Sequence, residues 1–203
     1  MIRALLFDLG NVLLLFSHER MCAQIAAECG LSQEEVWQML FETDLVQRWD
    51  RGELSELELH HAIEQQTERP LNRSRLVRAA SDIFELNSRM PPILRQLKRQ
   101  GYRLVLLSNT NSMHVDWIRE HYDIFDMFDA WVLSYEVHAI KPDPAIFTEA
   151  CRRAEAAPAE CFYTDDIRAY VDRARQLGID AEQFVGVDTL LDQLSVRGIR
   201  VEC

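Results

Sequence analysis

Short apolar runs alternate with amphipathic segments along most of the chain. Runs with the length and composition of buried strands lie at residues 3–8, 102–107, 130–134, 160–164 and 183–187. Apolar residues at helical spacing lie at residues 91–101, 113–122, 143–155, 169–177 and 189–195. Alternating strands and helices form a parallel sheet with helices on both faces. The pattern therefore predicts an α/β fold, in which ligands bind beyond the carboxyl ends of the strands.

A long span after the first strand breaks this alternation, because its apolar residues follow helical spacing without a convincing strand. Helices are expected in the segments LSQEEVWQMLFE (31–42), SELELHHAIEQQ (55–66) and SRLVRAASDIFEL (74–86). The first of these opens with Ser32 and has Glu35 three residues on, the arrangement of a capping box. We predict a helical insert at residues 16–87 and a core made of residues 1–15 and 88–203.

Composition and charge narrow the class of protein. With 203 residues and 48% hydrophobic content, the chain is long enough for one sizeable core with a small appended module. No apolar run is long enough to span a bilayer, and the net charge of −11 disfavours nucleic acids and anionic membranes as partners. The five scattered cysteines lack zinc-ligand spacing and indicate a reducing compartment. We therefore expect a cytoplasmic protein, monomeric or homodimeric, whose partner is a small molecule.

One carboxylate lies where packing gives no reason for it. The first apolar run, RALLFDLGNVLLLF, is interrupted by Asp8, which Gly10 and Asn11 follow closely. An ionised carboxylate in an apolar setting is costly unless a cation or several donors compensate it. Asp is also common in turns, where it caps the backbone. By itself the run leaves a bound group and a turn cap close to equal as explanations for Asp8.

Polar side chains also follow other strands of the expected sheet. The full set consists of Asp8, Ser108, Asn109, Lys141, Asp165 and Asp166. Each taken alone has a plain explanation as a helix cap or a surface charge. Lys141 is one of only two lysines, so either a compact ammonium group is wanted in its loop or its identity is chance. Because the carboxyl ends of parallel strands meet at one edge of a sheet, we expect these groups to lie together.

This set of groups suits phosphoryl transfer. A carboxylate such as Asp8 can attack phosphorus and form an aspartyl phosphate. Two like charges about 4 Å apart repel by about 4 kcal/mol at an effective dielectric constant of about 20, so attack on a phosphate dianion needs cations. Asp8, Asp165 and Asp166 offer the oxygen ligands that Mg²⁺ prefers. Lys141 and Ser108, with backbone amides at the start of the next helix, would hold the other phosphoryl oxygens.

The segments FDLGNV, LLSNT, KPDPAIF and YTDD, in this order, resemble the four motifs of the haloacid dehalogenase (HAD) superfamily. The resemblance covers the whole chain. It implies a Rossmann-like three-layer core with a parallel sheet, and a small all-α cap of the C1 type found in subfamily I. It also implies that Asp8 is the nucleophile and that Ser108 and Lys141 bind phosphate and steady the nucleophile.

The resemblance further implies a Mg²⁺ cofactor. The ligands it implies are Asp8, the backbone carbonyl of Gly10, Asp165 in an assisting role, and Asp166 as the main acidic ligand after the nucleophile. Asn11 and Asn109 lie in the same motifs, and we count them, with Gly10, among the substrate-binding residues. Ile167 and Tyr170 depart from the polar residues that are often found after the acid pair.

Gly10 departs from the family pattern in a way that bears on substrate choice. Most phosphatases of the superfamily carry a second Asp at this position, as general acid and base. Such help is typically worth roughly 10²–10⁴-fold, or about 3–5 kcal/mol. The FDLGNV form resembles the branch of α-glucose-1-phosphate phosphatases, which have Gly at this position. We hypothesise that the substrate is a sugar 1-phosphate, such as a hexose 1-phosphate, whose anomeric leaving group is more acidic than a simple alcohol.

The helical insert is expected to close over the site and read the leaving group. Arg20, Trp49 and Arg51 are the candidates for contacting the substrate, together with His18. Each also has a plainer explanation, with Trp49 in the core of the cap and the arginines as solvated charges.

Three functions follow from these residues. The first is Mg²⁺-dependent hydrolysis of a small phosphate monoester through an aspartyl-phosphate intermediate. The second is a 2-haloacid dehalogenase, which also uses an Asp nucleophile followed by Ser and Lys but needs no metal. The third is a catalytically weak phosphate-binding or scaffold protein, which the missing acid at Gly10 suggests. The pair Asp165–Asp166 favours the phosphatase over the dehalogenase, because dehalogenases usually lack it.

Overall fold

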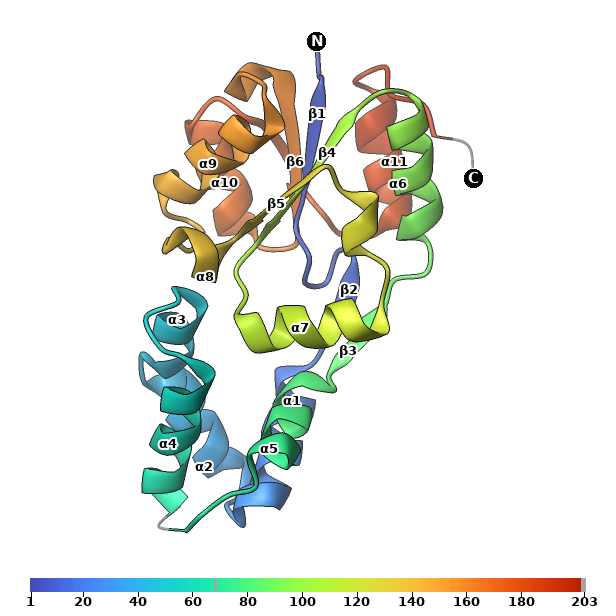
Figure 1. The fold of residues 1–203 in the computed structure, drawn as a ribbon. Coiled ribbons are helices and arrows are strands. Elements are labelled where there is room, and N and C mark those ends of the chain that lie inside the picture. The colour runs from blue at the N-terminus through green and yellow to red at the C-terminus, as the bar shows by residue number, and fades with distance from the viewer. Residues whose placement is uncertain (68, 202–203) are drawn as a thin grey trace.

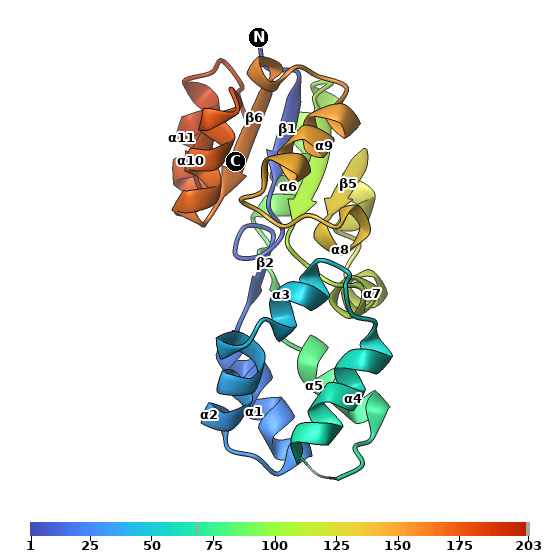
Figure 2. The ribbon, with the colours of Figure 1, turned by 90° about the vertical axis from the view of Figure 1, so that its left-hand side faces the viewer.

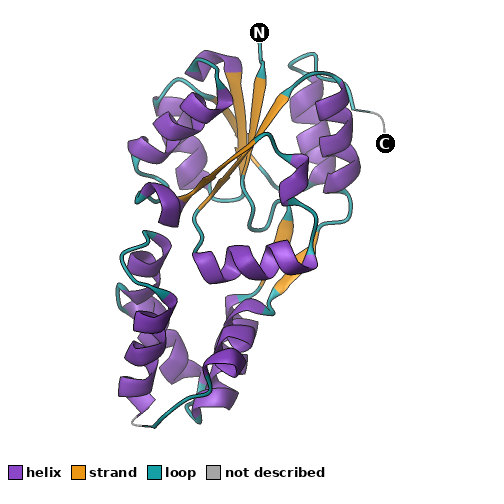
Figure 3. Ribbon diagram, viewed as in Figure 1, coloured by secondary structure: helices purple, strands orange, loops and turns teal. Residues whose placement is uncertain are grey.

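A computed structural model of the chain describes residues 1–67 and 69–201. Its centre is a parallel sheet of five strands in the order β5-β4-β1-β6-β7 (Figures 1 and 3). The bounds are Ala130–Leu133 for β5, Arg103–Ser108 for β4, Ala4–Phe7 for β1, Cys161–Asp165 for β6 and Asp180–Gln183 for β7. The prediction of an α/β fold with a parallel sheet is confirmed. No helix in this described part of the chain is long and apolar enough to cross a bilayer.

Helices cover both faces of the sheet and complete three layers (Figures 1 and 2). One face carries α6 (Met90–Arg99) and α11 (Val187–Ser195), and the other carries α8 (Ser134–Val137), α9 (Pro144–Ala154) and α10 (Arg168–Gln176). The side chains of β1 alternate between the two layers. Leu5 and Phe7 belong to the first buried cluster, whereas Ala4 and Leu6 belong to the second. Burial on both faces explains why this strand is apolar throughout.

The span between β2 and β3 forms a separate helical body below the sheet in Figure 1. Its helices are α1 (His18–Cys29), α2 (Gln33–Trp37) with a π-helical continuation at Gln38–Glu42, α3 (Leu45–Asp50), α4 (Glu56–Thr67) and α5 (Arg73–Ser81). They share a buried cluster of their own, to which Met113 of α7 (Ser112–His121) also contributes. We propose that residues 16–87 act as a cap on the core, and α7 lies between the two bodies.

Two predicted helix starts carry the expected caps. In α2, the Ser32 hydroxyl accepts from the Glu35 amide at 3.2 Å, and the Glu35 carboxylate accepts from the Ser32 amide at 2.7 Å. In α9, Asp143 accepts from the Ala145 amide at 2.8 Å, with Pro144 in the first turn. These local signals were sufficient because the capping partners are only a few residues apart.

The expectation of no strand within the helical insert at residues 16–87 is wrong. Residues Phe84–Leu86 form β3, which pairs antiparallel with β2 (Leu14–Phe16). The two strands carry the chain out to the cap and back, so they run side by side, and pairing satisfies their backbone groups. A three-residue strand is too short to show a period in the sequence, and the helical spacing of residues 74–86 predicts a helix that continues to residue 86.

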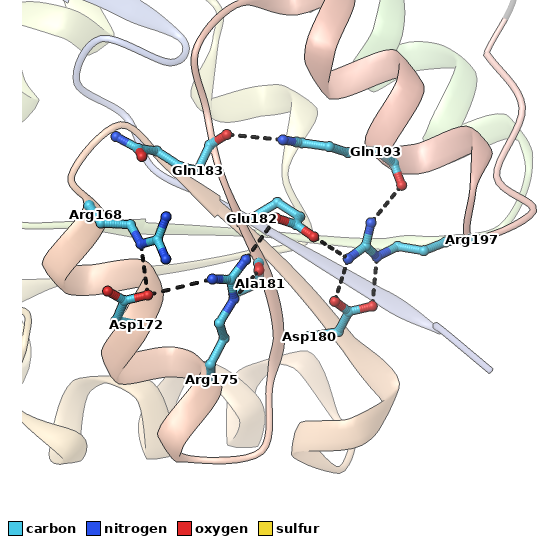
Figure 4. Close-up of polar contacts among 9 residues, drawn as sticks. All are labelled: Arg168, Asp172, Arg175, Asp180, Ala181, Glu182, Gln183, Gln193 and Arg197. Atoms are coloured by element: carbon cyan, nitrogen blue, oxygen red, sulfur yellow. Dashed lines mark hydrogen bonds and ion pairs between the residues drawn. The ribbon is translucent and has the colours of Figure 1, made fainter.

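The last strand is also displaced from its predicted position. It lies at Asp180–Gln183 rather than at 183–187, and its sequence DAEQ is mostly polar. As the edge of the sheet it needs only one buried side chain, Ala181, while its acidic residues bind arginines. Figure 4 shows the Arg197 guanidinium on Asp180 and Glu182, and Arg175 on Glu182 at 2.7 Å. Ion pairs replace the apolar pattern that the prediction relied on.

Candidate active site

The carboxyl ends of the three central strands place the predicted polar residues side by side. Phe7 of β1 lies opposite Leu106 of β4 and Thr164 of β6, so the residues that follow these positions meet at one edge, which faces the cap. Lys141 reaches the same place from the loop before α9. Its Nζ lies 2.7 Å from Asp8 Oδ1, 2.6 Å from Asp165 Oδ2 and 3.2 Å from the carbonyl oxygen of Leu107.

Lys141 is the cation beneath the site, with 2% of its surface exposed. Burial alone would lower the pKa of its ammonium group, but Asp165 and Asp8 outweigh burial and raise that pKa above its usual value. The Asn109 side chain binds both backbone polar groups of Lys141. Its Oδ1 accepts from the Lys141 amide at 2.7 Å, and its Nδ2 donates to the Lys141 carbonyl at 3.1 Å. Lys141 is therefore a protonated and rigidly placed group.

Asp8 is buried, and its carboxylate is held on one side only. Burial raises the pKa of Asp8 to about 7, although the neighbouring Lys141 lowers it. Oδ1 accepts from Lys141, while Oδ2 accepts no hydrogen bond from residues 1–67 or 69–201. Asp8 also lines the cavity between the core and the cap, hereafter the main cavity. One carboxylate oxygen is thus fixed and the other is free to react.

The two acids at the end of β6 differ in environment. Asp165 is fully buried, and its oxygens accept from Lys141, from the Tyr163 hydroxyl and from the Ile167 amide at 2.8 Å. Asp166 lines the cavity, and its Oδ2 accepts from Asn11 at 3.1 Å. Burial raises the pKa of Asp166, and the Asn11 bond lowers it. Asp165 thus supports Lys141, whereas Asp166 faces the space where a ligand would lie.

The acidic cluster suits a divalent cation. Asp8, Asp165 and Asp166 each offer one oxygen, and these oxygens lie within 4.8 Å of one another. Three carboxylates and one ammonium leave an excess of negative charge in a buried place, which a divalent cation would neutralise. The ligand atoms are all oxygens, as Mg²⁺ prefers. The residues therefore fit this metal, and the Gly10 backbone beside them lines the same cavity.

The loop after β4 supplies the remaining predicted groups. Ser108 has 2% of its surface exposed, and its hydroxyl lies 3.3 Å from the Asn109 carbonyl oxygen. Ser108 and Asn109 line a smaller cavity of about 80 Å³ beside the main one. Asn111 caps α7 by accepting from the His114 amide at 3.0 Å. Ser108 is thus more deeply buried than Asp166 and lines the smaller cavity rather than the one that contains Asp8.

A cavity of about 550 Å³ separates the core from the cap and has room for a small phosphate ester. Its lining contains Asp8, Gly10, Asn11, Phe16, His18, Val46, Gln47, Asp50, Arg51, Asn109, Ile140, Lys141, Pro142, Asp143, Asp166, Ile167 and Tyr170. Of the predicted cap residues, only His18 and Arg51 reach it. Trp49 is buried in the cap cluster, and the Arg20 guanidinium binds Asp82 at 3.2 Å instead.

Several lining or supporting residues were missed in the sequence. Tyr163 lies two positions before Asp165 on one strand, so their side chains share a face, and this period was an available signal. Gln47 and Asp50 come from α3 and carried no signal, because a polar residue on a short helix is ordinary.

The environment of Gly10 explains why a larger residue is absent there. A Cβ atom at this position would lie 2.6 Å from Phe16 Cε1. The Phe16 ring is itself packed against His18, with ring centroids 4.9 Å apart, and against Phe84. The space that a side chain at position 10 would use is therefore filled by an aromatic ring.

The chain is similar to known hydrolases and phosphatases in both sequence and structure. A family model of haloacid dehalogenase-like hydrolases matches residues 2–178. The D-ribitol-5-phosphate phosphatase of Bacteroides thetaiotaomicron is 26% identical over 191 residues, covering 90% of this chain and 92% of that protein. A sesquiterpene phosphatase of Aspergillus oryzae is 22% identical over 179 residues, 87% of each chain. The crystal structure of a HAD family enzyme from Bacteroides thetaiotaomicron, in complex with magnesium and inorganic phosphate, matches with a TM-score of 0.82 and 26% identity, covering 90% of this chain and 94% of that one.

Proposed function

This chain belongs to the haloacid dehalogenase-like hydrolases, and on that basis we propose that it hydrolyses small phosphate monoesters with Mg²⁺ as cofactor. The observation that carries the proposal is the carboxylate of Asp8, which lies with Asp166 at the floor of the cavity. Its Oδ1 is bound by Lys141 Nζ at 2.7 Å, and its Oδ2 accepts no such bond from the described residues. Two relatives over most of the chain are phosphatases, and a structural neighbour binds magnesium and inorganic phosphate.

In the proposed reaction, Asp8 Oδ2 attacks phosphorus, and the bond from phosphorus to the leaving oxygen breaks. The product is an aspartyl phosphate, which a water molecule then hydrolyses to free phosphate and the original carboxylate. Lys141 donates to Asp8 Oδ1 and so fixes the orientation of the carboxylate and of its reacting oxygen, Oδ2. Asp165 in turn fixes the position of the Lys141 ammonium group. The Ser108 hydroxyl and the Lys141 ammonium would each bind a phosphoryl oxygen.

The metal would be held by Asp8 and Asp166, with the Gly10 carbonyl beside them. When bound, Mg²⁺ polarises the phosphoryl oxygens and neutralises charge. Asn11 keeps Asp166 in place through its 3.1 Å bond. The Gln183 side chain donates to the Asp166 carbonyl at 2.8 Å, and the Gln183 carbonyl accepts from Gln193, as Figure 4 shows, so the edge strand steadies this ligand.

The finer parts of the proposal concern substrate and compartment. We propose a sugar phosphate, such as a hexose 1-phosphate, because Gly10 supplies no acid next to Asp8 and an anomeric leaving group needs less help from an acid placed elsewhere in the site. Preference for hexose 6-phosphates over 1-phosphates would count against it. Cys22, Cys29, Cys151 and Cys161 are buried free thiols, which supports a cytoplasmic setting.

Metal removal is the direct test of the function. We expect phosphate release from phosphate esters in the presence of Mg²⁺ and a loss of at least about 100-fold with a chelator, because the carboxylate cluster then repels the phosphate dianion. The measurement is phosphate release over a panel of esters, with halide release from 2-haloacids assayed in parallel. Metal-independent halide release would establish the dehalogenase instead. Phosphate binding without any turnover would establish the scaffold protein.

Restoring the usual acid at position 10 is expected to fail. The Gly10→Asp substitution places new atoms against Phe16, and overpacking of this kind typically costs about 1–3 kcal/mol of unfolding free energy. We expect lower stability and no gain in turnover, measured by urea unfolding and phosphate release. The control is the double variant Gly10→Asp with Phe16→Ala. In the Phe16→Ala background, Gly10→Asp should lower the unfolding free energy by less than it does in the wild type, because the ring is no longer in the way. A single variant as stable as the wild type would show that the Phe16 ring moves freely.

A further inference from the structure

Asp50 lies on the cap side of the cavity whose floor holds Asp8. It is the last residue of α3 and lines both the main cavity and the smaller one that contains Ser108. In an in-line displacement at phosphorus, the attacking and leaving oxygens lie on opposite sides. Because Asp8 attacks from the core, the leaving oxygen points toward the cap. Asp50 is the carboxyl group that lines the cavity from that side.

The position of Asp50 is set by contacts with the core. Asn111 Nδ2 donates to Asp50 Oδ1 at 3.1 Å, and Asn111 itself is buried at the start of α7, three residues after Ser108. The turn after Asp50 packs directly on α8, since a Cβ atom at Gly52 would lie 2.3 Å from the Tyr135 carbonyl oxygen. Oδ2 of Asp50 accepts no hydrogen bond within the described ranges. The carboxyl is therefore tethered by one oxygen and open at the other.

The surroundings of Asp50 favour its protonated form. Burial raises the pKa of Asp50 to about 6, and the hydrogen bond from Asn111 only partly opposes this. The other ionisable groups nearby are Arg51, His18 across the cavity, His114 of α7, which also contacts Asn111, and His138, which directly follows α8 and contacts the Arg51 carbonyl. Within the described residues, burial and the Asn111 bond are the influences on the Asp50 carboxyl, and no charged side chain is among them. A carboxyl group in this state can give a proton near neutral pH.

We propose that Asp50 replaces the acid missing at Gly10 and donates its proton to the leaving-group oxygen; the proposal rests on the phosphatase function above. In the first step the phosphorus–oxygen bond to the alcohol breaks, and the alcohol oxygen takes the proton of Asp50. In the second step the Asp50 carboxylate removes a proton from the water that attacks the aspartyl phosphate. The group returns to its starting state, so protons balance over one turnover.

His18 is the other titratable cap group at the cavity, and its contacts argue against this role. Its ring packs between the rings of Phe16 and Phe41, with centroids 4.9 and 4.6 Å away. Burial lowers the pKa of His18, so the imidazolium that would act as the acid is disfavoured. The packing assigns His18 to the aromatic wall of the cavity.

The test compares two leaving groups in the first turnover. The variant is Asp50→Asn, and the matched control is Asp44→Asn, the same change at the exposed other end of α3. A hexose 1-phosphate leaves as a sugar alkoxide that is far more basic than 4-nitrophenolate, whereas 4-nitrophenyl phosphate leaves as a stable anion that needs no proton. We expect Asp50→Asn to slow the first turnover of the hexose ester by at least about 100-fold. The burst of nitrophenolate should stay within about threefold of the wild-type rate.

A pH profile provides the second readout. An acid must be protonated to act, so the wild-type rate for the hexose ester should fall as pH rises past the pKa of Asp50. This limb should be absent with 4-nitrophenyl phosphate and in Asp50→Asn. Thermal unfolding of the variant should match the wild type, because the amide keeps the bond to Asn111.

Each remaining result overturns the assignment. Equal loss on both esters would show that Asp50 only positions the cap. Unchanged kinetics in Asp50→Asn would show that it has no role, and the selective pattern in His18→Asn would transfer the role to that residue. A wild type that releases no phosphate from either ester with Mg²⁺ would refute the phosphatase itself, whereas an active wild type with an unaffected Asp50→Asn refutes only the role of Asp50.

Discussion

Replacing Asp8 with Asn is expected to reduce turnover of phosphate esters by about 10⁴-fold or more, because an amide cannot attack phosphorus. Asn has the shape of Asp, and its side-chain oxygen can keep the 2.7 Å bond to Lys141. Folding should therefore survive while the reaction is lost. The measurement is phosphate release with Mg²⁺, with Asp44→Asn as a variant that lies away from the cavity.

A second observation separates a nucleophile from a group that merely binds the metal. Wild-type protein stopped during turnover should carry phosphate covalently on the peptide that contains Asp8, and mass spectrometry detects this added mass. Asp8→Asn should never acquire it. If the variant kept more than about 1% of the wild-type rate, water would have to attack phosphorus directly and the covalent mechanism would be wrong.

Replacing Lys141 with Met is expected to have the largest effect on stability. The substitution leaves Asp8 and Asp165 buried without their shared cation, and breaking a buried ion pair in this way costs about 3–5 kcal/mol. Phosphate release should be lost as well, because neither Asp8 nor the phosphate is then held. The measurement is urea unfolding without metal, beside the activity assay.

The chain provides its own control, since Lys98 is the other lysine. It is partly exposed and lies 3.3 Å from Asp129, so Lys98→Met should change the unfolding free energy by less than about 1 kcal/mol. Equal destabilisation by the two substitutions would contradict the role assigned to Lys141.

The loss in Lys141→Met should depend on pH with a definite sign. Burial already raises the pKa of Asp8 to about 7 with the ammonium present, and removing the ammonium raises it further. A carboxyl group whose folded pKa is raised loses stability as pH increases from its unfolded value through its folded value. The destabilisation should therefore be smaller near about pH 5 than near about pH 8.

Much of the fold followed from local patterns. Strands β1, β4, β5 and β6 lie close to their predicted places because each is buried and apolar. The strands that were missed or displaced are β2, β3 and β7. The first two are three residues long, and the third is stabilised by ion pairs with Arg175 and Arg197. None of them shows the pattern over several residues by which a strand is found in a sequence.

The sequence by itself determined which groups meet at the edge of the sheet. Asp8 and Asp166 directly follow buried strands and Ser108 ends one, and the strand ends of a parallel sheet converge whatever the details of packing. Only the tertiary structure decided that Asp165 lies beneath Lys141 while Asp166 faces the cavity, because Lys141 reaches Asp165 from a loop 24 residues away in the chain.

The cap shows more clearly which contacts could not be predicted from the sequence. Trp49 and Asp50 are adjacent, yet the first lies in the cap cluster and the second lines the cavity. Which face of α3 meets the substrate depends on how the helix docks on α8 and on the 3.1 Å bond from Asn111, a residue 61 positions away. Contacts between residues so distant in the chain leave no mark in the local pattern of α3, and so only the folded structure could place Asp50 opposite Asp8.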